Sequence, residues 1–283
     1  AALAGGEYNL WPAPDPTRFE VTWRHGTPGL VHIEGRDVQL IGRDQGLPSP
    51  WVWALAEDET GTVYVGTEAG LCAFARGRCT NVAGLPGEHV TALAPIRGGL
   101  AIGTNRGLVV RRGGHVGPVI ANAPVFQLVA DGHDRLAVRT RNEVLLVEGD
   151  AVVARHAADW YPALAPASAG GFWVGGADAV VRLEREGSTW VERERIPTTA
   201  TTVVHEDREG SLWVGSREAG ISQARAGWLW NVGAHEGLGG SAVFATYIDA
   251  AGVVWLTTTG GLARIADGRL TTWAVGQDIP VFG

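Results

Sequence analysis

A short cassette of residues recurs seven times along this chain at intervals of 36 to 42 residues. The clearest copy, residues 64–71, reads Tyr-Val-Gly-Thr, then two variable residues, then Gly-Leu. The Gly-Thr pair, or its substitute, begins at Gly26, Gly66, Gly103, Arg139, Gly175, Gly215 and Thr257. A period of this length that is filled by strands predicts a β-propeller, in which each repeat forms one four-stranded blade.

One repeat, residues 51–82, divides into four strands at its apolar runs and turns. Residues 52–56 are apolar on both faces, as a buried inner strand requires. Asp58 and Gly61 suit the first and fourth places of a type I turn, which leads into a second strand at 62–66. A third strand is expected at 70–74 and a fourth at 78–82. This order predicts an antiparallel meander.

The two ends of the chain predict how the ring closes. The first copy begins at its second strand, 19–23, and therefore lacks an inner strand, whereas the tail at 276–282 resembles the inner strand at 49–53. We expect an all-β, seven-bladed propeller of four-stranded antiparallel blades, its ring closed by N- and C-terminal strands in one shared blade. Residues 1–17 form a Pro-rich extension, and residues 18–283 form the propeller.

Charge and hydropathy exclude several partners. The net charge is −7 and acidic residues are interspersed among the arginines, so no basic face for nucleic acid is expected. No apolar run reaches the length of a membrane span, so no membrane is expected within this chain.

The two cysteines, Cys72 and Cys79, flank a predicted hairpin. They can form a disulfide in an exported protein or serve as small apolar fillers, and the residues favour neither interpretation. No histidine nearby supplies further ligands, so we expect no metal site, and no cofactor motif is present.

Three copies of the repeat resemble a known family. Gly46-Leu47-Pro48-Ser49, Glu57-Asp58, Gly61 and the cassette at 64–71 resemble the two-component-regulator propeller repeat. The copies at 206–221 and 236–255 resemble it closely, while the two around residues 125 to 195 lack the Gly-Thr or the Gly-Leu pair.

The resemblance implies a function as well as a fold. Members of the family commonly form periplasmic sensor regions of bacterial signalling proteins, several sense oligosaccharides, and many are fused to histidine kinase or diguanylate cyclase outputs. No kinase or cyclase motif occurs in this chain. It is therefore expected to be the sensing part alone, periplasmic or extracellular, with a signalling output domain as its partner in a longer protein.

In a propeller, the loops that enter the inner strands and those that join second to third strands share one face. Aromatic, Arg and carboxylate side chains in these loops suit an oligosaccharide or a small acidic ligand at the mouth of the central channel. The predicted ligand-binding residues are Trp51, His89, Arg106, Arg139, Trp160, Tyr161, Asp178 and Arg217.

Other conspicuous residues are interpreted as structural. Aspartates followed three residues later by Gly, such as Asp207 and Asp249, are predicted to form turns rather than to act in catalysis. Mid-strand aromatic residues before the Gly-Thr position are predicted to pack between blades; these are Tyr64, Trp213 and Trp255. The pattern also favours a core position for the aromatic residues that share one place in their inner strands, namely Trp53, Phe126 and Phe244.

These observations favour a non-catalytic, ligand-binding sensor propeller, and they predict no catalytic residue. A propeller lyase or hydrolase acting on a polysaccharide or a small cyclic substrate is the alternative. It would require His89 or His235 within hydrogen-bond reach of a carboxylate or of Tyr161. A protein-interaction scaffold is the second alternative.

Overall fold

The computed structural model describes residues 17–24, 27–34, 37–158, 162–225, 228–249 and 251–275. Regular structure in these residues consists of strands and of two single-turn 3-10 helices, η1 (Arg43–Gln45) and η2 (Ala234–Glu236). Neither of these helices approaches the length and apolarity that a membrane crossing needs. The chain divides into two compact units, Ala1–Arg141 with Leu145–Arg155 and Asn142–Val144 with His156–Gly283.

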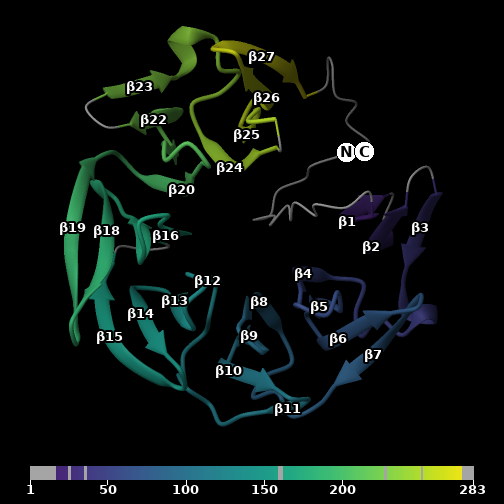
Figure 1. Cartoon of the computed structure of the whole chain (residues 1–283). Helices are drawn as coiled ribbons and strands as arrows, with labels where there is room; N and C mark the ends of the chain where they lie inside the picture. The colour runs from purple at the N-terminus through teal and green to yellow at the C-terminus, as the bar shows by residue number, and fades with distance from the viewer. Residues whose placement is uncertain are drawn as a thin grey trace. The chain divides into compact units, whose positions relative to one another are not determined.

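The strands form seven antiparallel sheets, each a meander in which strands consecutive in sequence pair (Figure 1). The first sheet has three strands, β1 (Thr17–Arg24), β2 (Thr27–Glu34) and β3 (Asp37–Ile41). The second has four, β4 (Val52–Glu57), β5 (Val63–Thr67), β6 (Gly70–Ala75) and β7 (Arg78–Val82). The third contains β8 (Val90–Ile96), β9 (Gly99–Thr104), β10 (Gly107–Arg112) and β11 (His115–Val116).

The remaining four sheets also have four strands each. The fourth contains β12 (Gln127–Ala130), β13 (Arg135–Arg139), β14 (Glu143–Glu148) and β15 (Ala151–Ala157). The fifth contains β16 (Ala163–Pro166), β17 (Phe172–Gly175), β18 (Ala179–Glu186) and β19 (Thr189–Pro197). The sixth contains β20 (Thr201–Glu206), β21 (Leu212–Ser216), β22 (Ile221–Arg225) and β23 (Trp228–Val232). The seventh contains β24 (Val243–Ile248), β25 (Val254–Thr258), β26 (Gly261–Ala266) and β27 (Arg269–Ala274).

The sheets confirm the predicted blades. Strands β4 to β7 lie within one residue of their expected bounds, and the degenerate repeats form complete four-stranded sheets. The first sheet has three strands and not four, which agrees with the prediction that the first copy of the repeat lacks its inner strand. The strand predicted at 276–282 to complete it, and most of the predicted N-terminal extension, lie outside the described residues.

Within each unit, the first strands of consecutive sheets lie side by side, β4 with β8 and β8 with β12 in one, β16 with β20 and β20 with β24 in the other. The glycine of the Gly-Thr pair permits this approach. A Cβ added to Gly66 would lie 2.7 Å from Cγ1 of Val90, and one added to Gly103 would lie 2.5 Å from Cγ1 of Val125. The glycines thus let each second strand meet the first strand of the next sheet.

The repeated aspartates form turns, as predicted. Oδ1 of Asp207 accepts hydrogen bonds from the backbone N–H groups of Glu209 (3.1 Å) and Ser211 (2.7 Å), and Oδ2 accepts one from Nε1 of Trp213 (2.8 Å). Asp249 accepts the equivalent bond from Trp255 at 3.2 Å. Each carboxylate therefore closes its turn and fixes the aromatic residue of the following strand.

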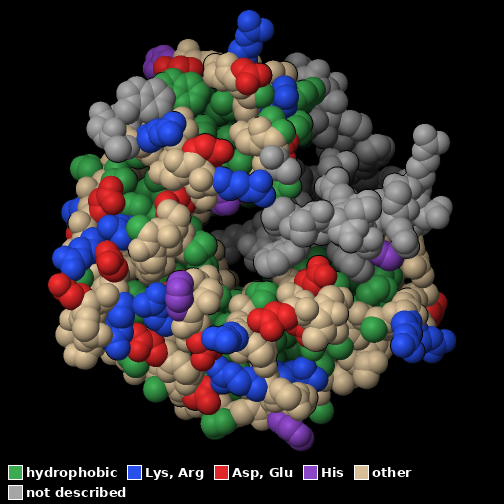
Figure 2. All heavy atoms as spheres, viewed as in Figure 1, with side chains coloured by type: hydrophobic (Ala, Val, Ile, Leu, Met, Phe, Trp, Pro, Cys, Tyr) green, Lys and Arg blue, Asp and Glu red, His purple; other side chains and the backbone are tan. Residues whose placement is uncertain are grey.

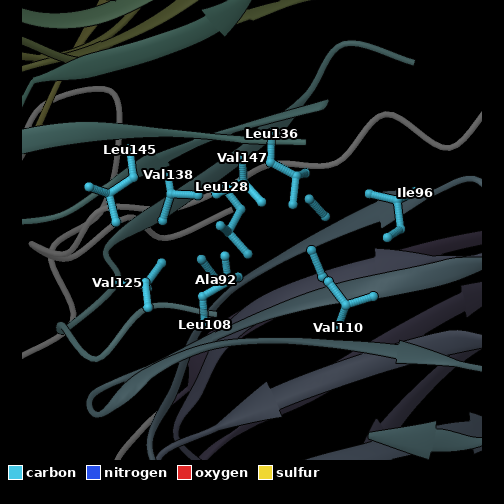
Figure 3. Close-up of a cluster of buried hydrophobic side chains, with 13 residues drawn as sticks. Ala92, Ile96, Leu108, Val110, Val125, Leu128, Leu136, Val138, Leu145 and Val147 are labelled. Atoms are coloured by element: carbon cyan, nitrogen blue, oxygen red, sulfur yellow. The ribbon is translucent and has the colours of Figure 1, made fainter. Parts of the chain in front are cut away.

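The core lies between neighbouring sheets. Figure 3 shows one cluster, in which side chains of β8–β10, such as Ala92 and Val110, face side chains of β12–β14, such as Leu128 and Val138. Tyr64 and Trp213 are buried in clusters that join two sheets, which confirms their predicted packing role. Trp255 is half-buried and stacks on Trp273 with the ring centroids 6.0 Å apart.

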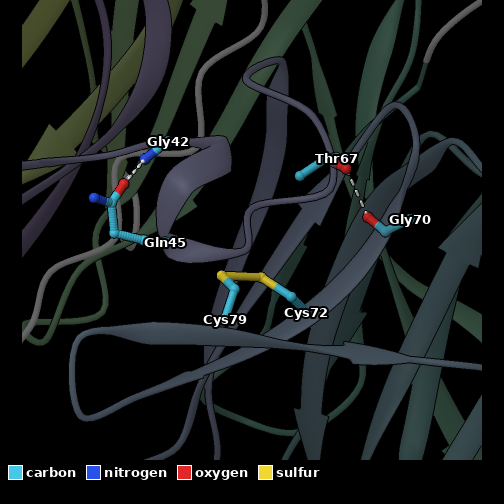
Figure 4. Close-up of a disulfide and its surroundings, with 6 residues drawn as sticks. All are labelled: Gly42, Gln45, Thr67, Gly70, Cys72 and Cys79. Carbon is cyan, nitrogen blue, oxygen red and sulfur yellow. Dashed lines mark hydrogen bonds between the residues drawn. A yellow bond between two sulfur atoms is a disulfide. The ribbon is translucent and has the colours of Figure 1, made fainter.

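Cys72 and Cys79 form a disulfide across the β6–β7 hairpin (Figure 4). The ladder pairs Cys72 with Asn81 and Phe74 with Cys79, so the cysteines lie diagonally on neighbouring strands. Their Cα atoms are 5.4 Å apart, within the range that a disulfide spans. The sequence leaves open whether the two cysteines form a disulfide or serve as small apolar fillers, and in the structure they form the disulfide.

Candidate functional site

Two sets of loops meet at one end of the sheets, as predicted. In the second sheet, the N–H of Glu68 in the β5–β6 loop donates to the carbonyl of Trp51, just before β4 (3.1 Å). In the third sheet, the N–H of Asn105 donates to the carbonyl of His89, just before β8 (2.9 Å). The loop between the second and third strands therefore lies against the segment that enters the first strand.

The threonine of the Gly-Thr pair shapes these loops. Oγ1 of Thr104 donates to the carbonyl of Gly107 (3.0 Å) and accepts from the N–H of Arg106 (3.1 Å). Thr67 makes the same kind of bonds, to the carbonyl of Gly70 (2.8 Å) and from the N–H of Ala69 (3.2 Å). Because both hydroxyls are on buried residues, the backbone that carries the loop side chains is held in place.

A pocket of about 550 Å³ opens between these two loops in the first unit. Its wall is formed by the β5–β6 loop, the end of β7, the β7–β8 connection and the β9–β10 loop. The lining residues are Ala69, Gly70, Asn81, Val82, Leu85, Pro86, Gly87, Glu88, Asn105 and Arg106. The pocket thus lies on the outermost strand of the second sheet and not on the first strands, where the predicted channel mouth would be.

The pocket wall has an apolar part and a polar part. Val82 and Leu85 are half-buried and pack on the core cluster between the two sheets, so they give the wall a firm apolar base. Asn81, Glu88 and Arg106 are exposed and supply amide, carboxylate and guanidinium groups. The exposed lining is mainly polar, so the pocket suits a small polar ligand that also has an apolar part.

The charged groups of the pocket are free to meet a ligand. Within the part of the chain that the structure describes, neither Glu88 nor Arg106 forms an ion pair or a side-chain hydrogen bond. Other opposite charges of this protein do pair, such as Arg112 with Asp134 (3.1 Å) and with Asp150 (2.7 Å). Over the face shown in Figure 2, acidic and basic side chains are interspersed and do not gather by sign.

His89 lies next to the pocket and contacts Trp53, with the ring centroids 5.0 Å apart. Burial lowers the pKa of His89 below its ordinary value, and the negative charge of Glu68 only partly opposes this shift. Its Nε2 is buried and has no hydrogen-bond partner among the described residues. The lowered pKa favours the neutral form of the His89 imidazole.

The structure corrects the interpretation of Trp53 and Phe244 as core residues. Trp53 is 42% exposed and Phe244 is 55% exposed, whereas Phe126 is half-buried. The register of β4 shifts at Trp53 and that of β24 shifts at Phe244, so a bulge turns each side chain away from the core. At the equivalent bulge in β8, Thr91 bonds the carbonyl of Val125 in the next sheet instead.

The predicted site residues fall into separate groups. Arg106 lines the pocket, and His89 and Trp51 lie in the segments that bond to its loops. Arg139 is 5% exposed at the end of β13, so it is a buried residue and does not line the pocket. Asp178 pairs with Arg195 at 3.1 Å.

Arg217 is exposed in the loop after β21, and its N–H donates to the carbonyl of Ala200 (3.0 Å). Trp160 and Tyr161 lie outside the described residues. Of the predicted residues, the structure therefore places Arg106 in the pocket wall and His89 and Trp51 beside it.

Sequence reasoning missed Asn81, Leu85 and Glu88. The signal that could have found them is the connection Gly84-Leu85-Pro86-Gly87, which joins β7 to β8 and carries an apolar residue outside any strand. A Cβ at Gly87 would clash with the side chains of Asn105 and Arg106, which shows how closely this connection and the β9–β10 loop approach. In the described residues, no group of His, Cys, Asp or Glu side chains could hold a metal ion.

Comparisons with known proteins agree with this fold. Residues 46–69 match the model of the two component regulator propeller, which confirms the predicted resemblance for that repeat. No curated protein matches the chain. Among solved structures, the extracellular domain of BT3049 from B. thetaiotaomicron, described as a hybrid two component system, superposes with a TM-score of 0.64 at 16% identity. That alignment covers 91% of this chain but 40% of the other.

Two other solved structures are also similar. Virginiamycin B lyase from Staphylococcus aureus has a TM-score of 0.57 at 13% identity, covering 80% of this chain and 84% of the lyase. The WD40 β-propeller domain of Doa1 has a TM-score of 0.62 at 13% identity, covering 88% of each chain. These likenesses show that the chain has the β-propeller fold.

Proposed function

We propose that this chain, a β-propeller that carries a two component regulator propeller repeat, is the ligand-binding sensor part of a bacterial signalling protein. The single observation that carries the proposal is the pocket of about 550 Å³ between the second and third sheets. It combines an apolar part with charged and amide side chains that form no ion pair or hydrogen bond among the described residues. Buried threonine hydroxyls hold the β5–β6 and β9–β10 loops of its wall in place. A preformed site of this kind binds a small molecule without a large ordering cost.

The place of action that we propose is outside the cytoplasm, in the periplasm or the extracellular space. The Cys72–Cys79 disulfide supports this location, since such bridges persist in oxidising compartments. The similarity to the extracellular domain of a two component system supports it as well. The chain spans 40% of that extracellular domain. In our proposal, an output domain in a longer protein would be the partner that receives the signal.

The lyase alternative would need His89 or His235 to contact a carboxylate or Tyr161. Among the described residues, neither histidine forms such a hydrogen bond, and Tyr161 lies outside them. No observation therefore favours the lyase over the sensor, although the lyase of S. aureus has a similar fold.

A thermal-shift screen tests the proposal. The protein is melted with oligosaccharides, small organic acids, amino acids and short peptides, and one class is expected to raise the melting temperature. The variant Ala69→Trp, which fills the pocket, should lose that shift. Ala75→Trp, at the opposite, exposed end of β6, is the matched control and should keep it. An equal shift in both variants, or no shift with any class, would contradict the proposal.

A further inference from the structure

We infer that the pocket takes a zwitterionic ligand of the amino-acid or short-peptide class, with its carboxylate on Arg106 and its ammonium group on Glu88. This inference rests on the proposed function, because it names the ligand class of the same pocket. It narrows the predicted ligand, a small molecule or an oligosaccharide, to a small molecule that the pocket recognises by charge at two points.

The first argument is the pair of opposite charges in one wall. Glu88 enters the pocket from the β7–β8 connection, and Arg106 enters it from the β9–β10 loop. Both are exposed, and in the described part of the chain they form no ion pair with each other or with another residue. Arg112 and Arg195, by contrast, each pair with a nearby Asp. Both charges are therefore available to a ligand in the pocket.

The second argument is the chemistry of the two groups. A guanidinium binds a carboxylate through two parallel N–H···O bonds, and a carboxylate accepts hydrogen bonds from an ammonium group. A ligand with one carboxylate and one ammonium group satisfies both charges. The hydroxyl groups of a neutral sugar can hydrogen-bond both side chains but neutralise neither charge, and a dianion would be repelled by Glu88.

The third argument is the surface between the two charges. The side-chain amides of Asn81 and Asn105 each offer donors and an acceptor, which match the N–H and C=O of a peptide group. Val82, Leu85 and Pro86 provide an apolar area for an aliphatic side chain. At about 550 Å³, the pocket has the size of sites that hold small ligands, so a dipeptide can enter it.

Titration calorimetry on the whole chain tests this inference. The probes are L-leucine, L-leucyl-L-leucine and tri-L-leucine, which increase the distance between the two charges. Each is compared with its N-acetylated form and with its C-amidated form. We expect at least one free zwitterion to bind, and we expect either blocking group to weaken its Kd about ten- to a hundredfold, because a hydrogen-bonded charge is lost.

Variants assign each charge to its partner. Arg106→Gln should weaken the free peptide about ten- to a hundredfold and leave the C-amidated peptide unchanged. Glu88→Gln should weaken the free peptide and leave the N-acetylated peptide unchanged. Arg97→Gln and Glu59→Gln change exposed charges outside the pocket and serve as matched controls. Circular dichroism confirms that each variant is folded.

The inference is overturned if blocked and free peptides bind equally, if Arg106→Gln and Glu88→Gln have no effect, or if no peptide binds. Maltotetraose, titrated in parallel, separates the two levels of the argument. If maltotetraose binds the unmodified chain but not the Ala69→Trp variant, and no peptide binds, the proposed ligand class is wrong and the sensor proposal stands. If no ligand class binds the pocket, both fail.

Discussion

Gly103, near the end of β9, lies against Val125 at the first strand of the next sheet. The variant Gly103→Ala tests the packing role of this repeated glycine. The added Cβ would lie 2.5 Å from Cγ1 and 2.9 Å from Cβ of Val125, and 3.4 Å from Cβ of Ala92. These atoms belong to a fully buried valine and a buried alanine, so neither can swing away. Overpacking of this kind costs about 1–3 kcal/mol of unfolding free energy.

The sign of the effect separates packing from backbone entropy. Gly103 has no positive φ, so alanine fits its backbone, and without the clash the substitution would stabilise the chain by about 0.4–1 kcal/mol. Gly239 is the matched control, because it also lacks a positive φ and has no atom within 4 Å of an added Cβ. Gly239→Ala should therefore be neutral or stabilising.

The assay is urea unfolding followed by tryptophan fluorescence, extended to a double-mutant cycle. Val125→Ala removes two buried methyl groups and should cost about 1.6 kcal/mol, at about 0.8 kcal/mol for each group, before any cavity cost. The same change opens space for the new Cβ, so the double variant should be more stable than the sum of the single effects by at least about 0.5 kcal/mol. A neutral Gly103→Ala, or strictly additive effects, would refute the reasoning.

Three further predictions concern the rest of the fold. Replacing Cys72 and Cys79 with alanine should lower the unfolding free energy by about 2.5 kcal/mol, which is the loop-closure entropy that the bridge removes from an unfolded loop of eight residues. Urea unfolding without reductant measures this loss, and an unchanged midpoint would contradict the prediction. Asp207→Ala should lower the unfolding free energy by about 1–3 kcal/mol, because alanine leaves the turn N–H groups and Nε1 of Trp213 unpaired. Asp207→Asn should lower it less, and equal losses in the two variants would contradict the prediction. Burial lowers the pKa of His205 despite the neighbouring carboxylates, so the unfolded chain binds the proton more tightly than the folded chain. The unfolding free energy should therefore rise as pH increases towards about 6.5, and His205→Gln should flatten that rise. An unaltered pH profile in the variant would speak against this prediction.

Much of the fold could be predicted because its signals are local. The Asp-x-x-Gly turn and the Gly-Thr pair act within a few residues, as the bonds of Asp207 and Thr104 show. Periodic apolar residues then define the strands between these turns. The degenerate fourth and fifth sheets form without the full cassette because their second strands keep continuous, buried apolar runs, at 136–138 in β13 and 172–174 in β17.

The candidate site was predicted less well because it depends on contacts between distant segments. The exposure of Trp53 follows from a register shift between β4 and β5, which alternation alone cannot reveal. The pocket forms where the connection containing Glu88 and the loop containing Arg106 meet the end of β7 and the β5–β6 loop, which belong to the preceding repeat. Asp178, a predicted ligand-binding residue, lies outside this pocket and forms an exposed ion pair with Arg195.

Hydrogen–deuterium exchange with the strongest ligand from the thermal-shift screen tests the central claim, that the pocket between the second and third sheets binds the ligand. The account predicts that protection on binding is concentrated in three segments, residues 67–70, 81–89 and 104–107, and that Ala69→Trp abolishes it. Protection that falls elsewhere, for instance at 177–179 or 216–219, with these three segments unchanged, would contradict the account.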